Sequence, residues 1–176
     1  MKYYLMRQDT KAQEVPHVIN WFKEINVEAM ETERYGELPK ITVLETTTAP
    51  NTQYKELVLN PFLLLPKEAG VILKAFEPWM EFKTVVLWDS TKKKNHKYVF
   101  PLLQRYDCLS EESILNRDKT VLEKGVLRKG DIPDQVLFMP AGVKSKMVIV
   151  REDFVEALLQ NGFLGYRLVE LEIGEK

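Results

Sequence analysis

The chain has 176 residues, of which 45% are hydrophobic and 29% charged, and its formal net charge is -1. This composition argues against disorder and favours a single domain over residues 1–176, because two halves would each be small for an independent core. The balanced charge and the single cysteine predict a cytoplasmic protein without a general affinity for nucleic acid or membranes.

The first 60 residues are less regular than the rest. Lys2 to Met6 predicts a short strand, because it is rich in aromatic and other β-favouring side chains. Residues 7 to 40 contain many glutamates and one apolar island from Val18 to Phe22. Ile41 to Glu45 predicts a second strand, and Lys55 to Leu59 a further extended piece.

Pro66 predicts the start of a helix, since its fixed φ suits the first helical position. Apolar residues then recur at the spacing of one helical face, and Pro78 predicts its end. The residues of that face are Ala69, Ile72, Leu73 and Phe76.

Two apolar runs, Phe82 to Trp88 and Tyr98 to Leu103, predict the strands of an antiparallel hairpin. The polar segment between them, Asp89 to Lys97, carries most of the local charge and predicts a basic tip. The same strand face holds Tyr98 and Phe100, which predicts that both rings pack in the core.

The C-terminal third predicts a strand from Val136 to Met139 and a strand that runs into a helix over Val148 to Leu159. Gly162 is suited to the left-handed position that ends a helix. A final strand is predicted over Gly165 to Leu171, with Val169, Leu171 and Ile173 alternating with glutamates. The predicted fold is therefore α+β, with a mainly antiparallel sheet and at least two packed helices.

The sequence lacks the usual arrangements of catalytic and cofactor-binding residues. Its two histidines and one cysteine show no zinc-ligand spacing, and it contains no glycine-rich phosphate loop and no Gly-x-Ser-x-Gly segment. We therefore expect no metal, no cofactor and no catalytic residue, and we expect Cys108 to be a core residue. Two alternatives stay open, namely a small enzyme with a dispersed site, such as Cys108 with His96, and a nucleic-acid-binding module that uses the Lys92–Lys97 hairpin.

The C-terminal part carries a recognisable series of segments. The series begins with an Asp-Cys-Leu segment, continues through an Ile-Pro pair and a Phe-containing strand, and ends in a strand, a helix and a glycine-led strand. Its residues are Asp107, Cys108, Leu109, Ser113, Ile132, Pro133, Val136–Met139, Val148–Leu159, Gly165–Leu171 and the opening Met1-Lys2-Tyr3-Tyr4. In this series the chain resembles a family of bacterial immunity proteins from polymorphic toxin systems, and it departs from that family at Arg151, where a serine is usual. The resemblance implies a non-catalytic protein that binds and neutralises a cognate protein toxin.

Two segments are predicted to contact such a partner. Glu28, Glu31 and Glu33 lie in the acidic N-terminal segment, which suits a basic partner because opposite charges speed association. Lys93 and His96 lie in the predicted hairpin loop, and loops on a rigid scaffold often carry recognition. These five residues are the partner-binding candidates.

Overall fold

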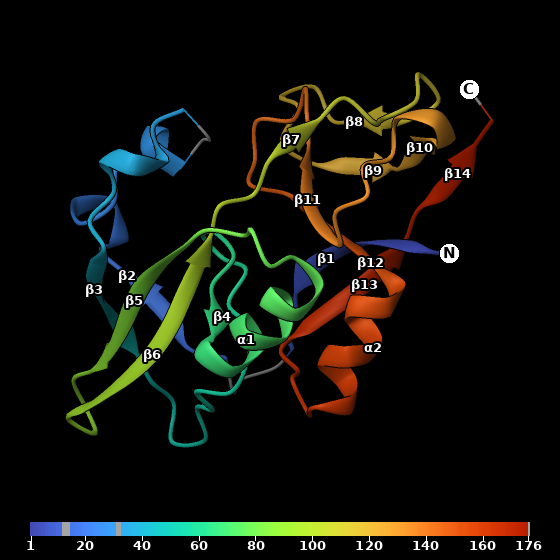
Figure 1. Cartoon of the computed structure of the whole chain (residues 1–176). Coiled ribbons are helices and arrows are strands. Elements are labelled where there is room, and N and C mark those ends of the chain that lie inside the picture. Colours follow the sequence, from blue (N-terminus) through green and yellow to red (C-terminus); the bar gives the residue numbers. More distant parts are fainter. Residues whose placement is uncertain (12–14, 31–32, 176) are drawn as a thin grey trace.

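The computed structural model describes residues 1–11, 15–30 and 33–175, and of residues 27 and 28 it describes the backbone alone. Two five-stranded sheets lie beside each other with the helices α1 and α2 packed against them (Figure 1). The helices are α1 (Lys67–Phe76) and α2 (Glu152–Gln160), with short 3-10 helices η1 (Trp21–Lys23), η2 (Val27–Met30), η3 (Tyr35–Glu37) and η4 (Lys129–Asp131). Most strand pairs are antiparallel, which confirms the predicted α+β class, but three pairs in the described residues are parallel.

The first sheet has the strand order β13-β1-β12-β11-β7. Its strand β1 confirms the predicted N-terminal strand and lies between two strands from the other end of the chain, β12 and β13. The strands of this sheet are β1 (Tyr3–Gln8), β7 (Arg105–Tyr106), β11 (Leu137–Pro140), β12 (Val148–Arg151) and β13 (Tyr166–Glu170). Two small sheets lie beside it, formed by β8 (Ile114–Leu115) with β9 (Leu122–Lys124) and by β10 (Val126–Arg128) with β14 (Glu172–Gly174).

The second sheet has the strand order β2-β3-β5-β6-β4. Its strands are β2 (His17–Ile19), β3 (Ile41–Thr47), β4 (Leu65–Pro66), β5 (Phe82–Asp89) and β6 (Lys94–Pro101). The β5–β6 hairpin confirms the predicted one, but its strands pair as far as Asp89 opposite Lys94, so the connecting turn is shorter than the predicted loop. The β3–β5 pair is parallel, because the chain passes through β4 and α1 between the two strands.

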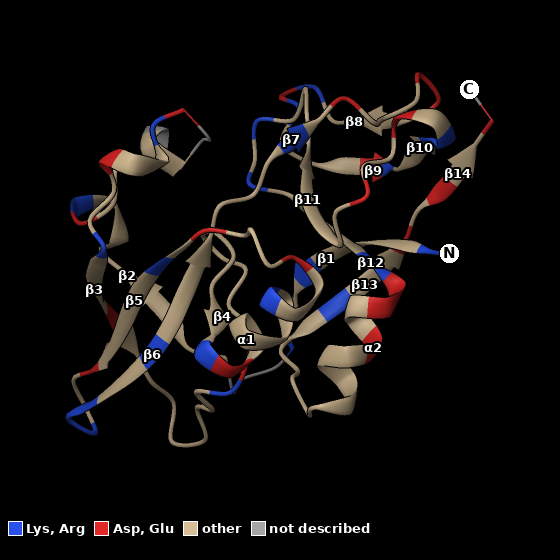
Figure 2. Cartoon of the chain, viewed as in Figure 1, with Lys and Arg blue, Asp and Glu red and all other residues tan. Residues whose placement is uncertain are grey.

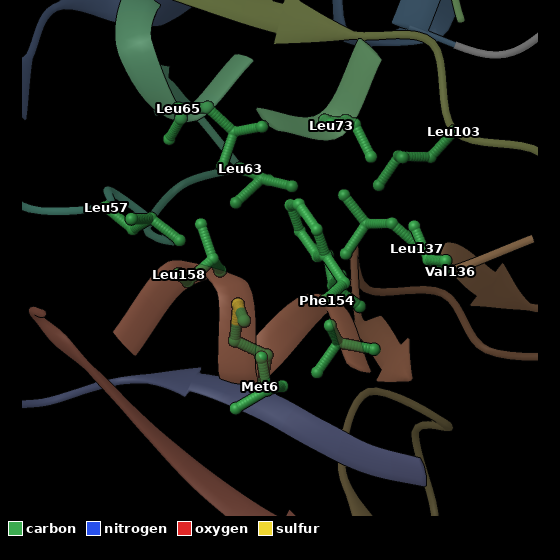
Figure 3. Packing of buried hydrophobic residues seen from close by; sticks show 14 of the residues in the cluster. Met6, Leu57, Leu63, Leu65, Leu73, Leu103, Val136, Leu137, Phe154 and Leu158 are labelled. Carbon is green, nitrogen blue, oxygen red and sulfur yellow. The ribbon is translucent and has the colours of Figure 1, made fainter. Parts of the chain in front are cut away.

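A shared apolar core joins the helices to both sheets. Leu73 of α1, Phe154 and Leu158 of α2 and Met6 of β1 belong to one buried cluster (Figure 3). The N-terminal segment covers the inner face of the second sheet, and a second buried cluster lies between them. Tyr98 and Phe100 belong to this cluster and are buried, as predicted. A third cluster, which contains Cys108, lies between the first sheet and the small strand pairs.

Three predictions about local structure need correction. Pro66 has ψ 146° and closes β4, so it caps α1 and the first helical residue is Lys67. Lys55 to Leu59 forms no strand and contributes only a bridge between Val58 and Leu64. The last predicted strand breaks at Leu171, because the chain leaves β1 there and pairs with β10. Val169 lies on the edge strand and is 43% exposed, whereas Leu171 is 5% exposed.

The ends of α2 follow from its sequence. Glu152 and Asp153 occupy the first turn, where the positive end of the helix dipole favours carboxylates. Gly162 has φ 76°, and the N–H of Phe163 donates to the carbonyl of Leu158 at 3.0 Å, which closes the C-terminal end. Both predicted end positions are confirmed, with Arg151 as the cap residue.

We expect Cys108 to react slowly with thiol reagents in the folded protein. Its side chain is fully buried, and burial raises the pKa of the thiol to about 11, so little thiolate forms at neutral pH. Because this is the only cysteine, labelling with a maleimide reports on this site alone. Labelling should become fast in denaturant, and rapid labelling of the native protein would show that the thiol is accessible.

Candidate functional site

The predicted partner-binding residues do not form one site. Glu33 is exposed just before η3, beside the start of β3, whereas Lys93 and His96 belong to the other end of the sheet, where β5 and β6 are joined (Figure 1). Glu28 lies in η2, where its side chain is outside the described part, and Glu31 lies outside the described residues. The acidic segment and the hairpin tip must therefore be considered separately.

Asp89 fixes the turn of the hairpin. Its buried Oδ1 accepts hydrogen bonds from the backbone N–H groups of Thr91 at 3.0 Å and Lys92 at 2.9 Å. Burial opposes the charge of this carboxyl, but the two N–H groups hold its pKa below the usual value. Lys93 follows with φ 53°, which completes the reversal of the chain. Figure 2 shows lysines gathered at this turn between β5 and β6.

His96 lies on β6 and not in a loop, which corrects the prediction. Its ring stacks on Tyr54 with 3.5 Å between ring centroids and 5° between planes. The Tyr54 hydroxyl and Thr46 Oγ1 are 2.8 Å apart in a hydrogen bond, which anchors the pair to β3. Nε2 of His96 is buried and has no hydrogen-bond partner in the described residues. The stacked pair therefore joins strand β6 to the loop that contains Tyr54.

An open groove of about 950 Å³ lies beside this stacked pair, and we call it the hairpin groove. It is lined by the loop Thr52–Lys55, by α1, by the hairpin and by the segment that ends α2. The lining residues used below are Tyr54, Lys55, Glu68, Val71, Ile72, Lys92, Lys94, His96 and Phe163. Lys93, although predicted as a site residue, is exposed in the turn and does not line the groove.

The outer face of the second sheet is the other candidate surface. A Cβ on Gly70 would lie 2.6 Å from Cγ2 of Val99, so this glycine lets α1 pack closely against the β6 side of that face. The β3 side stays uncovered, and Ile41 and Val43 are 63% and 55% exposed. We call the uncovered part the open sheet face, and it consists of Ile19, Ile41, Val43, Glu45, Val86 and Trp88.

A shallow pocket of about 290 Å³ lies on the open sheet face, with Trp88 and Val43 among its lining residues. Glu24 and Glu45 also line it, and both are exposed. The acidic segment therefore reaches this face through Glu24, which was not among the predicted contact residues. The surface combines apolar side chains with carboxylates.

The open sheet face had a signal in the sequence. Ile41 to Leu44 is apolar on both faces of the strand except for Thr42, whereas a strand with one wet face alternates with polar residues. The hairpin groove had none, because its walls come from four segments far apart in the chain. A tryptophan is by default expected to pack in the core, but Trp79, which follows α1, is 68% exposed.

The residues of the dispersed-site alternative are not brought together. Cys108 is buried in the cluster of the first sheet, whereas His96 lies on the second sheet against Tyr54. Within residues 1–11, 15–30 and 33–175, no group of three or more histidine, cysteine, aspartate or glutamate side chains could hold a metal ion. The described helices include none that is long and apolar enough to cross a membrane.

We expect the stability of the protein to fall as the pH drops below about 6.5, the usual pKa of histidine. Burial lowers the pKa of His96, and the positive charges of Lys94 and Lys92 act in the same direction. The negative charge of Asp89 raises this pKa, but the net shift is downward. The unfolded chain therefore binds a proton at His96 more tightly than the folded chain does. The contribution of neutral His96 to stability is fully present above the unfolded pKa and is lost as the pH falls below it. Thermal melts of His96→Phe, which keeps a ring against Tyr54, should lose part of this pH dependence.

The matched control is His17→Phe, which removes the other histidine at an exposed position. Its melting profile should follow that of the unchanged protein. An identical pH profile for His96→Phe and the unchanged protein would contradict the assignment of this pH dependence to His96.

No protein-family model matches the chain, and no curated protein matches it either.

Proposed function

We propose that this chain is an immunity protein of a bacterial polymorphic toxin system, which binds its cognate toxin and neutralises it without chemistry of its own. The observation that carries the proposal is the open sheet face. Ile41 and Val43 are neighbours on one strand face, both more than half exposed, beside Trp88. Exposed apolar groups that gather on one surface mark interaction sites, and tryptophan is enriched among residues that dominate binding.

The charges around the open sheet face indicate what kind of partner it would bind. Glu24 and Glu45 border the apolar pocket, and Glu33 is exposed at the start of the neighbouring segment. Such a surface suits a partner with apolar and basic groups, because opposite potentials steer association. A basic toxin that acts in the cytoplasm, such as a nuclease, fits this chemistry. The resemblance in residues 107–171 supports the same class.

The nucleic-acid alternative remains weaker. The formal charge of -1 lacks the basic excess that makes phosphate contacts dominate affinity. Lysines do gather at the β5–β6 turn, yet Glu68 also lines the adjacent groove. We therefore place the function in protein binding, without a membrane or a cofactor.

Co-expression with the product of the adjacent gene tests the proposal. A toxin encoded there should be toxic alone, harmless with this chain, and recovered with it as a stoichiometric complex after purification. A toxin that stays lethal and does not copurify with a folded, soluble preparation of this chain would overturn the proposal.

A further inference from the structure

The hairpin groove differs in chemistry from the open sheet face. Three exposed lysines, Lys55, Lys92 and Lys94, line it against a single carboxylate, Glu68. Within the described part of the chain, none of the three lysines forms an ion pair, although Lys92 is near enough to the buried Asp89 to help lower the pKa of that carboxyl. Their ammonium groups are therefore available to an anionic partner, and the two surfaces share no residue.

The groove also has an apolar wall. Val71 of α1 is 63% exposed although it is aliphatic, and Ile72 and Phe163 continue the lining. The ring of Tyr54 faces the groove from the other side, held by its contact with His96. A ligand that carried only charge would leave these side chains uncovered, so the groove suits a ligand with both acidic and apolar groups.

The sheet edge beside the groove fits an extended peptide. β4 pairs with β6 only at Tyr98 and Val99, whereas β6 begins at Lys94. The part of β6 from Lys94 to Lys97 thus has β5 as its only described strand neighbour. A free edge can accept an added strand, and alternate side chains of that strand then supply specificity.

We propose that the hairpin groove binds an acidic, apolar peptide segment of a partner protein. Carboxylates of the segment lie near Lys55, Lys92 and Lys94, and its apolar side chains lie on Val71 and Ile72. The Asp89 turn holds the backbone at Lys92 and Lys94 in place before binding, which reduces the ordering needed on binding. This site does not depend on the toxin proposal, because a protein without a toxin partner could still bind such a segment.

Fluorescence anisotropy with a labelled peptide that alternates glutamate and leucine tests this site. Lys92→Glu with Lys94→Glu should weaken binding by about tenfold or more, since attraction at two positions becomes repulsion. Lys93→Glu with Lys129→Glu is the matched control, because it makes the same charge change at exposed lysines that neither line the groove nor lie on the free edge of β6. Val71→Ser, at an exposed position, should also weaken binding, and a peptide with lysine in place of glutamate should not bind.

Three outcomes would overturn the site. Equal losses in both double variants would mean nonspecific charge attraction. Equal or tighter binding of single-stranded DNA or inorganic polyphosphate, lost in the Lys92/Lys94 variant, would assign the groove to general anions. No peptide binding at millimolar concentration by a preparation with the unchanged melting temperature would also exclude it. None of these results bears on toxin neutralisation, which the co-expression experiment tests separately.

Discussion

Leu158→Ala is expected to lower the free energy of unfolding by about 2–5 kcal/mol. Leu158 has no exposed surface and belongs to the cluster in which α2 meets α1 and the first sheet (Figure 3). Shortening it removes apolar contacts and leaves a cavity, because Phe154 and Leu73 are also held in that cluster and can fill the space only in part. The loss should appear in urea or thermal unfolding, with about 2–4 °C in melting temperature for each kcal/mol.

Leu159→Ala is the matched control, since it makes the same deletion one residue further along the same helix. Leu159 is 50% exposed, so its variant should stay within about 0.5 kcal/mol of the unchanged protein. Equal effects of the two substitutions would mean that α2 does not bury the Phe154–Leu158 face.

The features that could be predicted from the sequence are local ones. The helix α2 carries acidic residues at its start, an apolar stripe and a glycine at its end, all within a few residues of one another. The β5–β6 hairpin joins neighbouring segments, so its pairing follows from two apolar runs and the polar turn between them. These signals needed no knowledge of the rest of the chain.

The features that could not be predicted depend on pairing between distant segments. β1 pairs with β12 and β13 from the opposite end of the chain, and no local pattern specifies that choice. The break at Leu171 follows from the parallel pairing of β14 with β10, which the alternation of residues 169–173 does not reveal. His96 was a candidate by its position near the tip, but its stacking on Tyr54 depends on a loop from the other side of β6.

The open sheet face shows the same division between local and distant information. The apolar character of Ile41 and Val43 is visible in the sequence and signals a strand that buries both faces. Whether another part of the chain covers them depends on where α1 packs, and Gly70 places α1 over Val99 and away from β3. The sequence thus supplies the apolar side chains, whereas the tertiary packing decides that they stay exposed.

The double variant Ile41→Lys with Val43→Lys is expected to reduce affinity for the proposed toxin partner by about a hundredfold and to abolish protection in co-expression. Each position removes an apolar contact and places a positive charge before a basic partner, and two contacts of more than 1 kcal/mol each account for a loss of this size. Both side chains are more than half exposed, so the fold should keep its melting temperature within a few degrees.

The matched control is Ile114→Lys with Leu159→Lys, which makes the same chemical change at apolar residues that are 51% and 50% exposed elsewhere on the molecule. This control should bind and protect like the unchanged protein, and Trp79→Ala tests whether the most exposed tryptophan contributes separately. The open sheet face would lose its role if its variant stayed protective while Trp79→Ala or the control lost binding. Loss of binding in the open-face variant alone, at unchanged melting temperature, would place the toxin on the open sheet face at β3, because both variants introduce the same charges and only this one alters that face.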